Sequence, residues 1–238
     1  MDSHIPEADP GTRMSDSGES RVRGVVLAGG RSTRFGDADK ALATVGGRPL
    51  VARAVDAAAE ATDGVPLLSV ATDAQAERLT DALGDRSVES VRDDPALSGP
   101  LAGLSAALGA TDAPWLFVCA CDMPLVSPAS VGALRSRLVA AETDTDGDGV
   151  EAGDGERVDA VVPVVDGYDQ PLHALYRRTA VADALAGLSA GDALMALLDG
   201  LAVERVRAES VDAPLGEATT NVNTREELAA LRGDETRR

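Results

Sequence analysis

The sequence predicts a three-layer α/β protein in which helices cover both faces of a mostly parallel sheet. Short apolar segments typical of buried strands alternate along the chain with longer amphipathic segments typical of helices. The length of 238 residues suits one domain of this class. Aromatic residues make up only 2% of the chain, so Val, Leu and Ala must form most of the core. In sheets of this kind, binding sites gather at the carboxyl ends of the strands.

The predicted elements follow one another in a regular order. Strands are predicted for residues 21–28, 65–71, 88–91, 115–121 and 158–165, each a short apolar run. Helices are predicted for residues 50–61, 74–83, 101–110, 128–140, 179–188, 192–198 and 224–231. Pro49 and Pro100 suit the starts of two of these helices, because proline needs no hydrogen-bond partner there.

Two polar segments interrupt this alternation. Residues 1–20 are predicted to be a disordered acidic tail, and residues 21–238 to be a single domain. Within that domain, residues 142–157 are predicted to form an acidic surface loop. Its alternating aspartates from Asp144 onward resemble a calcium loop, but position 12, which should be a bidentate glutamate, is Gly155. We therefore expect a solvated surface there and no calcium site.

The charge of the chain excludes several partners. The formal net charge is −18, which disfavours binding to nucleic acid or to anionic membranes. No apolar stretch approaches the roughly 20 residues that span a bilayer. Lys40 is the only lysine among 22 basic residues. An acidic excess with lysine nearly eliminated predicts a halophilic protein, because concentrated salt screens the repulsion.

The cysteines and the N-terminus predict a cytoplasmic location. Cys119 and Cys121 lie two apart in an apolar run, where a disulfide ring would be strained. Reduced thiols are usual in the cytoplasm. Residues 1–20 also lack the apolar region of a signal peptide.

The glycine-rich segment LAGGRSTRFGDADKAL, residues 27–42, carries the strongest chemical signal. A strand ends at Gly29 and Gly30, where backbone N–H groups can face an anion. Arg34 and Lys40 add positive charge, although the segment matches neither a P-loop nor a GxGxxG loop. A tight surface turn is the alternative. The only lysine of the chain favours a phosphate site, since a compact ammonium suits a confined phosphate.

Asp122 is the candidate metal ligand. It directly follows the predicted strand 115–121, in the segment CDMP. Magnesium usually takes one or two carboxylates together with substrate phosphates, and a single aspartate at a strand end meets that need. An aspartate that merely caps a loop is the alternative.

These motifs together resemble a known family. LAGGxSxRxGxxDK, SGPLAG at residues 98–103, CDMP and the terminal NVNT are similar to motifs of the nucleotidyltransferases that make molybdenum cofactor dinucleotides. The resemblance covers residues 22–231, and SGPLAG marks the guanylyl branch. It implies a Rossmann-like sheet of the nucleotide-diphospho-sugar transferase type. The implied reaction moves GMP from GTP to molybdopterin, with Mg²⁺ as cofactor and pyrophosphate as the second product.

The resemblance also implies roles for individual residues. Arg34, Lys40 and Asp122 would be catalytic, with Asp122 as a metal ligand. Asn223 would complete the metal shell or, together with Asn221, contact the pterin. The alternative is that this motif only caps the last helix. The implied GTP-binding residues are Leu27, Ala28, Gly29, Gly30, Lys40, Asp93, Gly99 and Asp122.

Two adjacent aspartates are candidates for guanine recognition. Either Asp93 or Asp94 matches the family aspartate that accepts from the guanine N1–H and N2–H₂ groups, and Asp93 is preferred because it follows the strand more closely. The family often has an asparagine after the second strand, where this chain has Ala71-Thr72-Asp73, and Thr72 is a candidate substitute. Close packing through Gly103 is the structural alternative for SGPLAG.

His173 lies in the segment 170–176, which resembles the region lining the acceptor pocket. It has no nearby triad partners in the sequence and is expected to be a core or rim histidine. The expected partners of the chain are GTP, molybdopterin, and molybdoenzymes or cofactor-delivery proteins that receive the product.

Three other functions compete with this prediction. A cytidylyltransferase for the same cofactor should carry LAAG and lack the GPLAG motif. A guanylyltransferase for adenosylcobinamide phosphate should not show both GPLAG and CDMP. A non-catalytic nucleotide-binding regulator could dispense with the metal aspartate.

Overall fold

One large mixed sheet organises the computed structural model, which describes residues 21–29, 39–145 and 157–235. The strands are β1 (Val22–Leu27), β2 (Thr44–Val45), β3 (Arg48–Pro49), β4 (Leu67–Val70), β5 (Glu89–Arg92), β6 (Trp115–Ala120), β7 (Ala160–Val165), β8 (Tyr168–Asp169), β9 (His173–Arg177) and β10 (Val203–Arg207). The α-helices are α1 (Leu50–Ala61), α2 (Asp73–Leu83), α3 (Pro100–Gly109), α4 (Pro128–Thr145), α5 (Arg178–Leu185), α6 (Leu194–Leu198), α7 (Leu215–Ala218) and α8 (Arg225–Glu235). Two short 3₁₀ helices are η2 (Lys40–Leu42) and η3 (Ala208–Ser210).

The sheet has the strand order β10-β7-β9-β6-β1-β4-β5, and the short β8 pairs with β7. Strand β1 is parallel to β4 and β6, β4 is parallel to β5, and β7 is parallel to β10. Only β8 and β9 pair antiparallel with their neighbours in this sheet, among the residues described. The prediction of a mostly parallel sheet is confirmed. Strands β2 and β3 form a separate hairpin that leads into α1.

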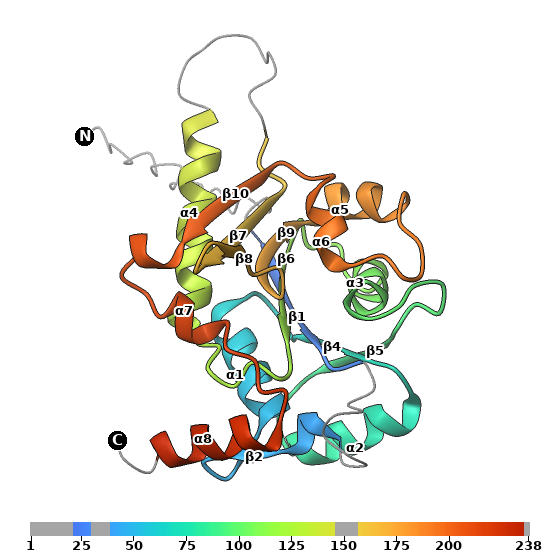
Figure 1. Cartoon of the computed structure of the whole chain (residues 1–238). Helices are drawn as coiled ribbons and strands as arrows, with labels where there is room; N and C mark the ends of the chain where they lie inside the picture. Colours follow the sequence, from blue (N-terminus) through green and yellow to red (C-terminus); the bar gives the residue numbers. More distant parts are fainter. Residues whose placement is uncertain (1–20, 30–38, 146–156, 236–238) are drawn as a thin grey trace, which may run out of the picture.

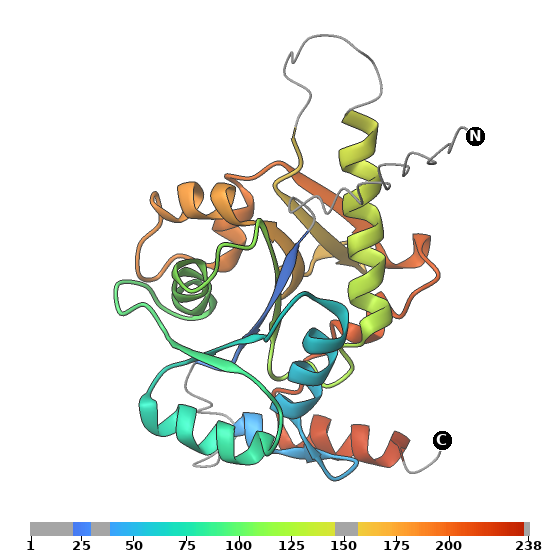
Figure 2. The ribbon, with the colours of Figure 1, turned by 180° about the vertical axis from the view of Figure 1, so that it is seen from behind.

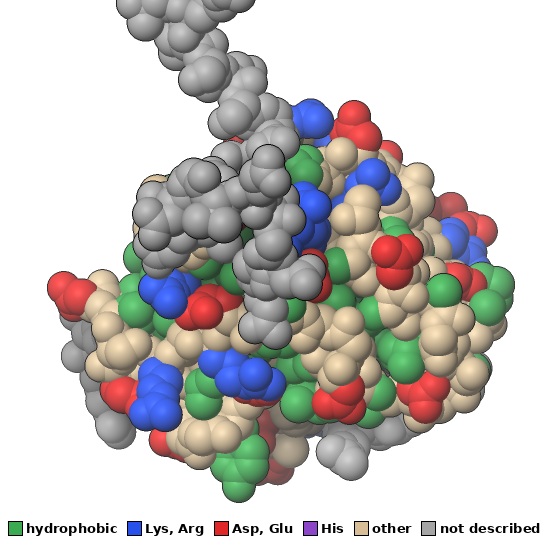
Figure 3. Space-filling model, turned by 90° about the horizontal axis from the view of Figure 1, so that it is seen from above, with side chains coloured by type: hydrophobic (Ala, Val, Ile, Leu, Met, Phe, Trp, Pro, Cys, Tyr) green, Lys and Arg blue, Asp and Glu red, His purple; other side chains and the backbone are tan. Residues whose placement is uncertain are grey.

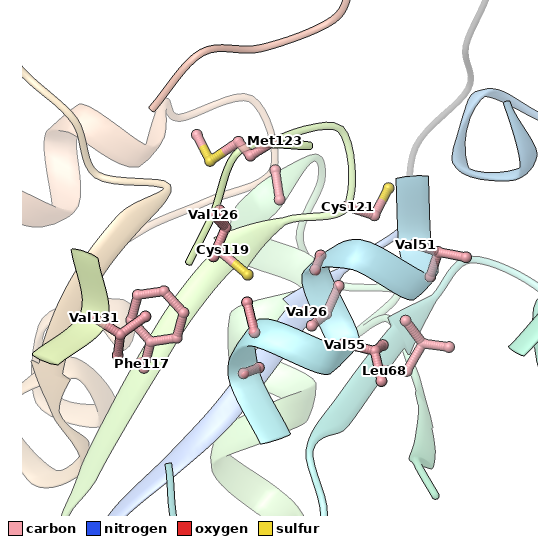
Figure 4. Close-up of a cluster of buried hydrophobic side chains, with 14 of the residues drawn as sticks. Val26, Val51, Val55, Leu68, Phe117, Cys119, Cys121, Met123, Val126 and Val131 are labelled. Atoms are coloured by element: carbon pink, nitrogen blue, oxygen red, sulfur yellow. The ribbon is translucent and has the colours of Figure 1, made fainter. Parts of the chain in front are cut away.

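Helices cover both faces of the sheet, as predicted (Figures 1 and 2). Residues of α1, α2 and α4 form one apolar cluster with the sheet, and residues of α3, α5 and α6 form a second cluster. Successive strand residues enter different clusters, because side chains alternate across a strand. In Figure 4, Val51 and Val55 of α1 lie close to Val26 of β1 and Leu68 of β4. The sheet is therefore the middle layer of three.

All the predicted strands and helices are present, with ends shifted by a few residues, but the short elements β2, β3, β8 and α7 and the longer strands β9 and β10 were not predicted. Strand β9 carries a histidine and an arginine although all five of its residues are buried. Its Arg177 stacks over the Trp115 ring at 4.4 Å, so the pattern did not look like a buried strand. Strand β10 is at the sheet edge, where Arg205 pairs with Asp169 of β8 at 2.9 Å.

The predicted acidic loop 142–157 was wrong at its beginning. Helix α4 continues through Thr145, so the first four residues of that segment are helical. Two interactions support this last turn: Arg177 donates to Glu142 at 3.2 Å, and Thr143 donates to the Val139 carbonyl at 2.7 Å. Residues 146–156, which hold most of the calcium-like pattern, and the predicted tail 1–20 lie outside the described residues.

Acidic and basic side chains lie interspersed on the face of the molecule shown in Figure 3. Ion pairs form across the described residues, such as the pair of Arg137 with Glu204 at 2.7 Å. No helix among the described residues is long and apolar enough to cross a membrane. Such pairs do not change the net charge, which stays at −18 because acidic residues outnumber basic ones 40 to 22.

We expect the folded state to need concentrated salt. The Debye length shortens from about 10 Å at 0.1 M salt to about 3 Å at 1 M, which weakens repulsion between surface carboxylates. Thermal unfolding followed by circular dichroism in 0.1 M and 1 M KCl should show a clearly higher Tm in the second. Sucrose, which adds no ions, is the control for a general cosolvent effect. An equal Tm at both salt concentrations would refute the halophilic interpretation.

Candidate functional site

Four neighbouring strands end at the same edge of the sheet, and the segments that follow them are joined by backbone hydrogen bonds. Ala28 after β1 donates to the Ser69 carbonyl of β4 at 2.9 Å. Cys121 after β6 donates to the Leu27 carbonyl at 3.0 Å, and Asp93 after β5 donates to the Val70 carbonyl at 3.0 Å. The parallel register of β5, β4, β1 and β6 thus brings the predicted motifs together at this edge.

Lys40 lies at the centre of the predicted site. Its ammonium Nζ donates to Asp122 Oδ2 at 2.5 Å and to Asn223 Oδ1 at 2.9 Å. These partners are 82 and 183 residues away along the chain. Lys40 is 9% exposed and begins η2, whose N-cap is Asp39. The structure therefore joins the glycine-rich segment, CDMP and NVNT through a single buried cation.

Asp122 retains unused capacity to bind a cation. Its Oδ1 atom is buried and has no hydrogen-bond partner among the described residues, and the same holds for Asn221 Oδ1. The Val222 N–H donates to the Asp122 carbonyl at 2.9 Å, which holds these two segments together. Carboxylate and amide oxygens are the donors that a magnesium ion takes, so these residues fit that ion. The described residues contain no group of three His, Cys, Asp or Glu side chains able to hold a metal.

The NVNT segment also caps α8. The Thr224 hydroxyl accepts from the Glu227 N–H at 3.1 Å. Glu227 Oε2 in turn accepts from the N–H groups of Asn223 and Thr224, at 2.5 and 3.1 Å. This reciprocal pattern is a capping box. Because the cap uses only the backbone of Asn223, its side chain remains able to bind Lys40.

The two adjacent aspartates Asp93 and Asp94 have different environments. Asp94 accepts from Ser105 Oγ at 2.7 Å and from the Ala96 N–H at 2.9 Å, and the bond from Ser105 lowers the Asp94 pKa below its usual value. Asp93 instead lies at the glycine-rich segment: a Cβ added to Gly29 would come within 1.9 Å of Asp93 Oδ2. Asp94 therefore shapes its own turn, whereas Asp93 faces the predicted nucleotide loop.

The two glycines of SGPLAG each have a structural reason. Gly99 is the N-cap of α3 with φ +59°, a backbone conformation that favours glycine. Gly103 lies where α3 packs on the sheet, and an added Cβ would meet Ser69 Oγ at 2.2 Å. Close packing through Gly103, which the sequence left as an alternative, is confirmed. A nucleotide contact of Gly99 stays a prediction.

Gln75 is a residue of this site that the sequence analysis missed. Its side-chain amide donates to the Ala28 carbonyl at 2.9 Å and to Asp39 Oδ2 at 3.3 Å. It thus holds the chain on both sides of residues 30–38. Thr72 caps α2 by accepting from the Gln75 N–H at 3.1 Å, so Thr72-x-x-Gln75 matches a capping box in sequence. That pattern could have indicated the helix start, but not the reach of the glutamine to Ala28.

The other sequence candidates lie either outside the described residues or in the core. Gly30 and Arg34 lie outside the described residues. His173 is fully buried with its ring edge-to-face against Phe117, at a centroid distance of 5.2 Å. Burial lowers the pKa of His173 to about 3, so the ring is neutral near pH 7. Cys119 and Cys121 are buried free thiols, and burial raises the pKa of Cys119 to about 12.

Solved structures share this fold. The molybdopterin-guanine dinucleotide biosynthesis protein A of Archaeoglobus fulgidus superposes with a TM-score of 0.67 at 24% identity, covering 91% of this chain and 100% of its own. Rv0371C of Mycobacterium tuberculosis, solved as a complex with manganese, superposes with a TM-score of 0.60 at 23% identity and covers 90% of this chain and 98% of its own.

Sequence relatives identify the family. Residues 24–208 match the MobA-like NTP transferase domain. A probable molybdenum cofactor guanylyltransferase of Natronomonas pharaonis is 34% identical over 80% of this chain and 92% of its own length. Another, of Haloferax mediterranei, is 32% identical over 94% of this chain and 98% of its own. The chain therefore belongs to the MobA-like NTP transferases and is a nucleotidyltransferase of the molybdenum cofactor guanylyltransferase family.

Proposed function

We propose that this protein transfers GMP from GTP to the terminal phosphate of molybdopterin and releases pyrophosphate, with Mg²⁺ as cofactor. One observation carries the proposal: the buried Lys40 ammonium contacts both Asp122 and Asn223 at the edge of the sheet where Gly29 meets Asp93. One end of the site thus holds a cation and metal-binding oxygens, and the other a carboxylate oxygen that has no hydrogen-bond partner among the described residues. A nucleoside triphosphate needs both kinds of group.

At the phosphate end, Lys40 and Arg34 bind the triphosphate. A lysine is a point charge that can turn from Asp122 toward phosphate oxygens within the same small space. Asp122 and Asn223 would hold a magnesium ion, which would supply positive charge to neutralise the phosphates. The nucleotide lies along a wall of backbone atoms from Leu27, Ala28, Gly29 and Gly30.

The reaction is an in-line displacement at the α-phosphorus of GTP. An oxygen of the molybdopterin phosphate forms the new bond to this phosphorus, and the bond to the β-phosphate oxygen breaks, so pyrophosphate leaves with its electron pair. The attacking phosphate is ionised at neutral pH and needs no general base. Lys40 and Arg34 therefore act by positioning the phosphates and stabilising the charge that builds on them.

At the base end, Asp93 accepts from the guanine N1–H and N2–H₂ groups. Only guanine among the common bases presents these two donors side by side.

The free thiols Cys119 and Cys121 fit a reducing compartment, which supports a cytoplasmic location.

We expect GTP to support turnover far better than ATP or CTP. ATP and CTP would leave Asp93 facing an acceptor or an empty space, and a buried site that loses such hydrogen bonds can discriminate by several orders of magnitude. The assay combines purified protein, molybdopterin, Mg²⁺ and each NTP in 1 M KCl, and measures pyrophosphate release. Omitting molybdopterin is the control for simple hydrolysis. A preference for CTP would assign the chain to the cytidylyltransferases.

A further inference from the structure

We propose that Ser69 and Gly103 are positioning residues for base recognition. The Ser69 hydroxyl, in a space that a glycine at position 103 leaves open, orients the Asp93 carboxylate toward the 2-amino group of guanine. This inference rests on the proposed guanine contact of Asp93, and it concerns two residues that need not touch the nucleotide.

Ser69 connects the nucleotide loop to the base-reading carboxylate. It is 1% exposed near the end of β4, and its hydroxyl donates to Asp93 Oδ1 at 2.5 Å. Its carbonyl accepts from the Ala28 N–H at 2.9 Å. One buried residue therefore sets the position of Asp93 relative to the backbone that precedes Gly29.

Gly103 makes the Ser69 geometry possible. A Cβ at this position of α3 would lie 2.2 Å from Ser69 Oγ and 2.9 Å from Leu27 Cδ2. Real Cβ atoms do not approach that closely, so any side chain at position 103 would displace the hydroxyl or move α3. The last glycine of SGPLAG thereby affects the base end of the site through Ser69.

The bond from Ser69 leaves the Asp93 carboxylate able to read two donors. An ionised carboxylate has about four acceptor positions, and Ser69 uses one of them on Oδ1. Oδ2 lies against Gly29 and receives no hydrogen bond from any described residue. Without the Ser69 hydroxyl the Asp93 carboxylate could rotate. Binding of guanine would then weaken most, because guanine needs both carboxylate oxygens in the correct orientation.

The experiment compares GTP with inosine triphosphate, which keeps the N1–H group and lacks the 2-amino group. For each variant, kcat/KM is measured with both nucleotides at saturating molybdopterin. Ser69→Ala should raise the KM for GTP more than it lowers kcat, and should reduce the GTP/ITP preference about tenfold, as expected for losing a hydrogen bond to a charged group. Ser105→Ala is the matched control, since Ser105 makes the same kind of bond to the neighbouring Asp94. The GTP/ITP preference of the Ser105→Ala variant should stay within about twofold of the wild-type value.

A double variant tests the link to Gly103. Gly103→Ala should lower the GTP/ITP preference as Ser69→Ala does. Adding Gly103→Ala to Ser69→Ala should lower it little further, because the hydroxyl that the new methyl group displaces is already gone. A purely structural role for either residue would instead reduce turnover of GTP and ITP in equal proportion, which would overturn the inference. If Gly103→Ala does not fold, the GTP/ITP preference of Ser69→Ala alone tests the inference.

Two results separate this inference from the function on which it rests. If Asp93→Asn abolishes the GTP preference and Ser69→Ala preserves it, the positioning role is refuted and the guanine contact stands. If the wild type turns over GTP and ITP equally well, the contact of Asp93 with the 2-amino group of guanine is refuted, and the positioning role with it.

Discussion

Replacing Asp122 with asparagine is expected to lower kcat by about 10²-fold or more at saturating magnesium. An amide has nearly the shape of a carboxylate but no charge, so it binds Mg²⁺ poorly. Removing one electrostatic element of this kind from an active site costs about 10² to 10³ in rate. Asparagine can still accept a hydrogen bond from Lys40, so the fold should be retained. Steady-state pyrophosphate release measures the rate, and circular dichroism the fold.

Asp169→Asn is the matched control for this substitution. Asp169 is also a largely buried carboxylate paired with one basic residue, Arg205, at 2.9 Å. It lies on β8, which pairs with β7, two strands away from β6 in the sheet. This variant should keep near-normal turnover. Near-normal turnover of Asp122→Asn at saturating magnesium would refute the metal role of Asp122.

Replacing Lys40 with methionine is expected to have an effect of similar size, about 10²-fold or more on kcat/KM for GTP. Methionine is unbranched and apolar, so it retains much of the bulk of lysine and removes its charge. The substitution removes a cation from the phosphates and leaves Asp122 and Asn223 without their shared donor. Lys40→Arg should restore little activity, because a planar guanidinium does not fit the space of a compact ammonium that is 9% exposed.

Arg86→Met is the control for removing one positive charge from an acidic protein. Arg86 pairs with Asp56 at 2.6 Å on the surface and belongs to none of the site segments. The Arg86→Met variant should have the same KM for GTP as the wild type. Recovery of normal kcat/KM in Lys40→Arg would show that any positive charge suffices, and normal kcat/KM in Lys40→Met would refute the phosphate role.

The edge of the sheet at which the site lies could be predicted from the sequence, because the motif residues directly follow buried strands. Asp122 follows β6 and Asp93 follows β5, and parallel strands bring their carboxyl ends together. The preference for Asp93 over Asp94 also rests on position, and its contact with guanine stays a prediction. The end of a strand determines the direction of the side chain that follows it, and the strand end can be located from the sequence pattern.

The contacts within the site could not be predicted in the same way. Lys40 meets Asn223 across 183 residues, and no local pattern encodes that approach. Gln75 looks like an ordinary helix-capping residue until the structure shows its amide at Ala28. Strand β9 was missed because its arginine is buried against an aromatic ring, an arrangement that only tertiary packing creates.

Following the guanylyl group itself tests the central claim most directly. The protein is incubated in 1 M KCl with molybdopterin, Mg²⁺ and GTP that carries a label on its α-phosphate. The products are then separated and identified by mass spectrometry. We predict that label moves to molybdopterin as a guanine dinucleotide, in equal amount to the pyrophosphate released, and that omitting either Mg²⁺ or molybdopterin prevents this. Pyrophosphate formed without labelled molybdopterin, or label transferred equally well from CTP, would contradict the account.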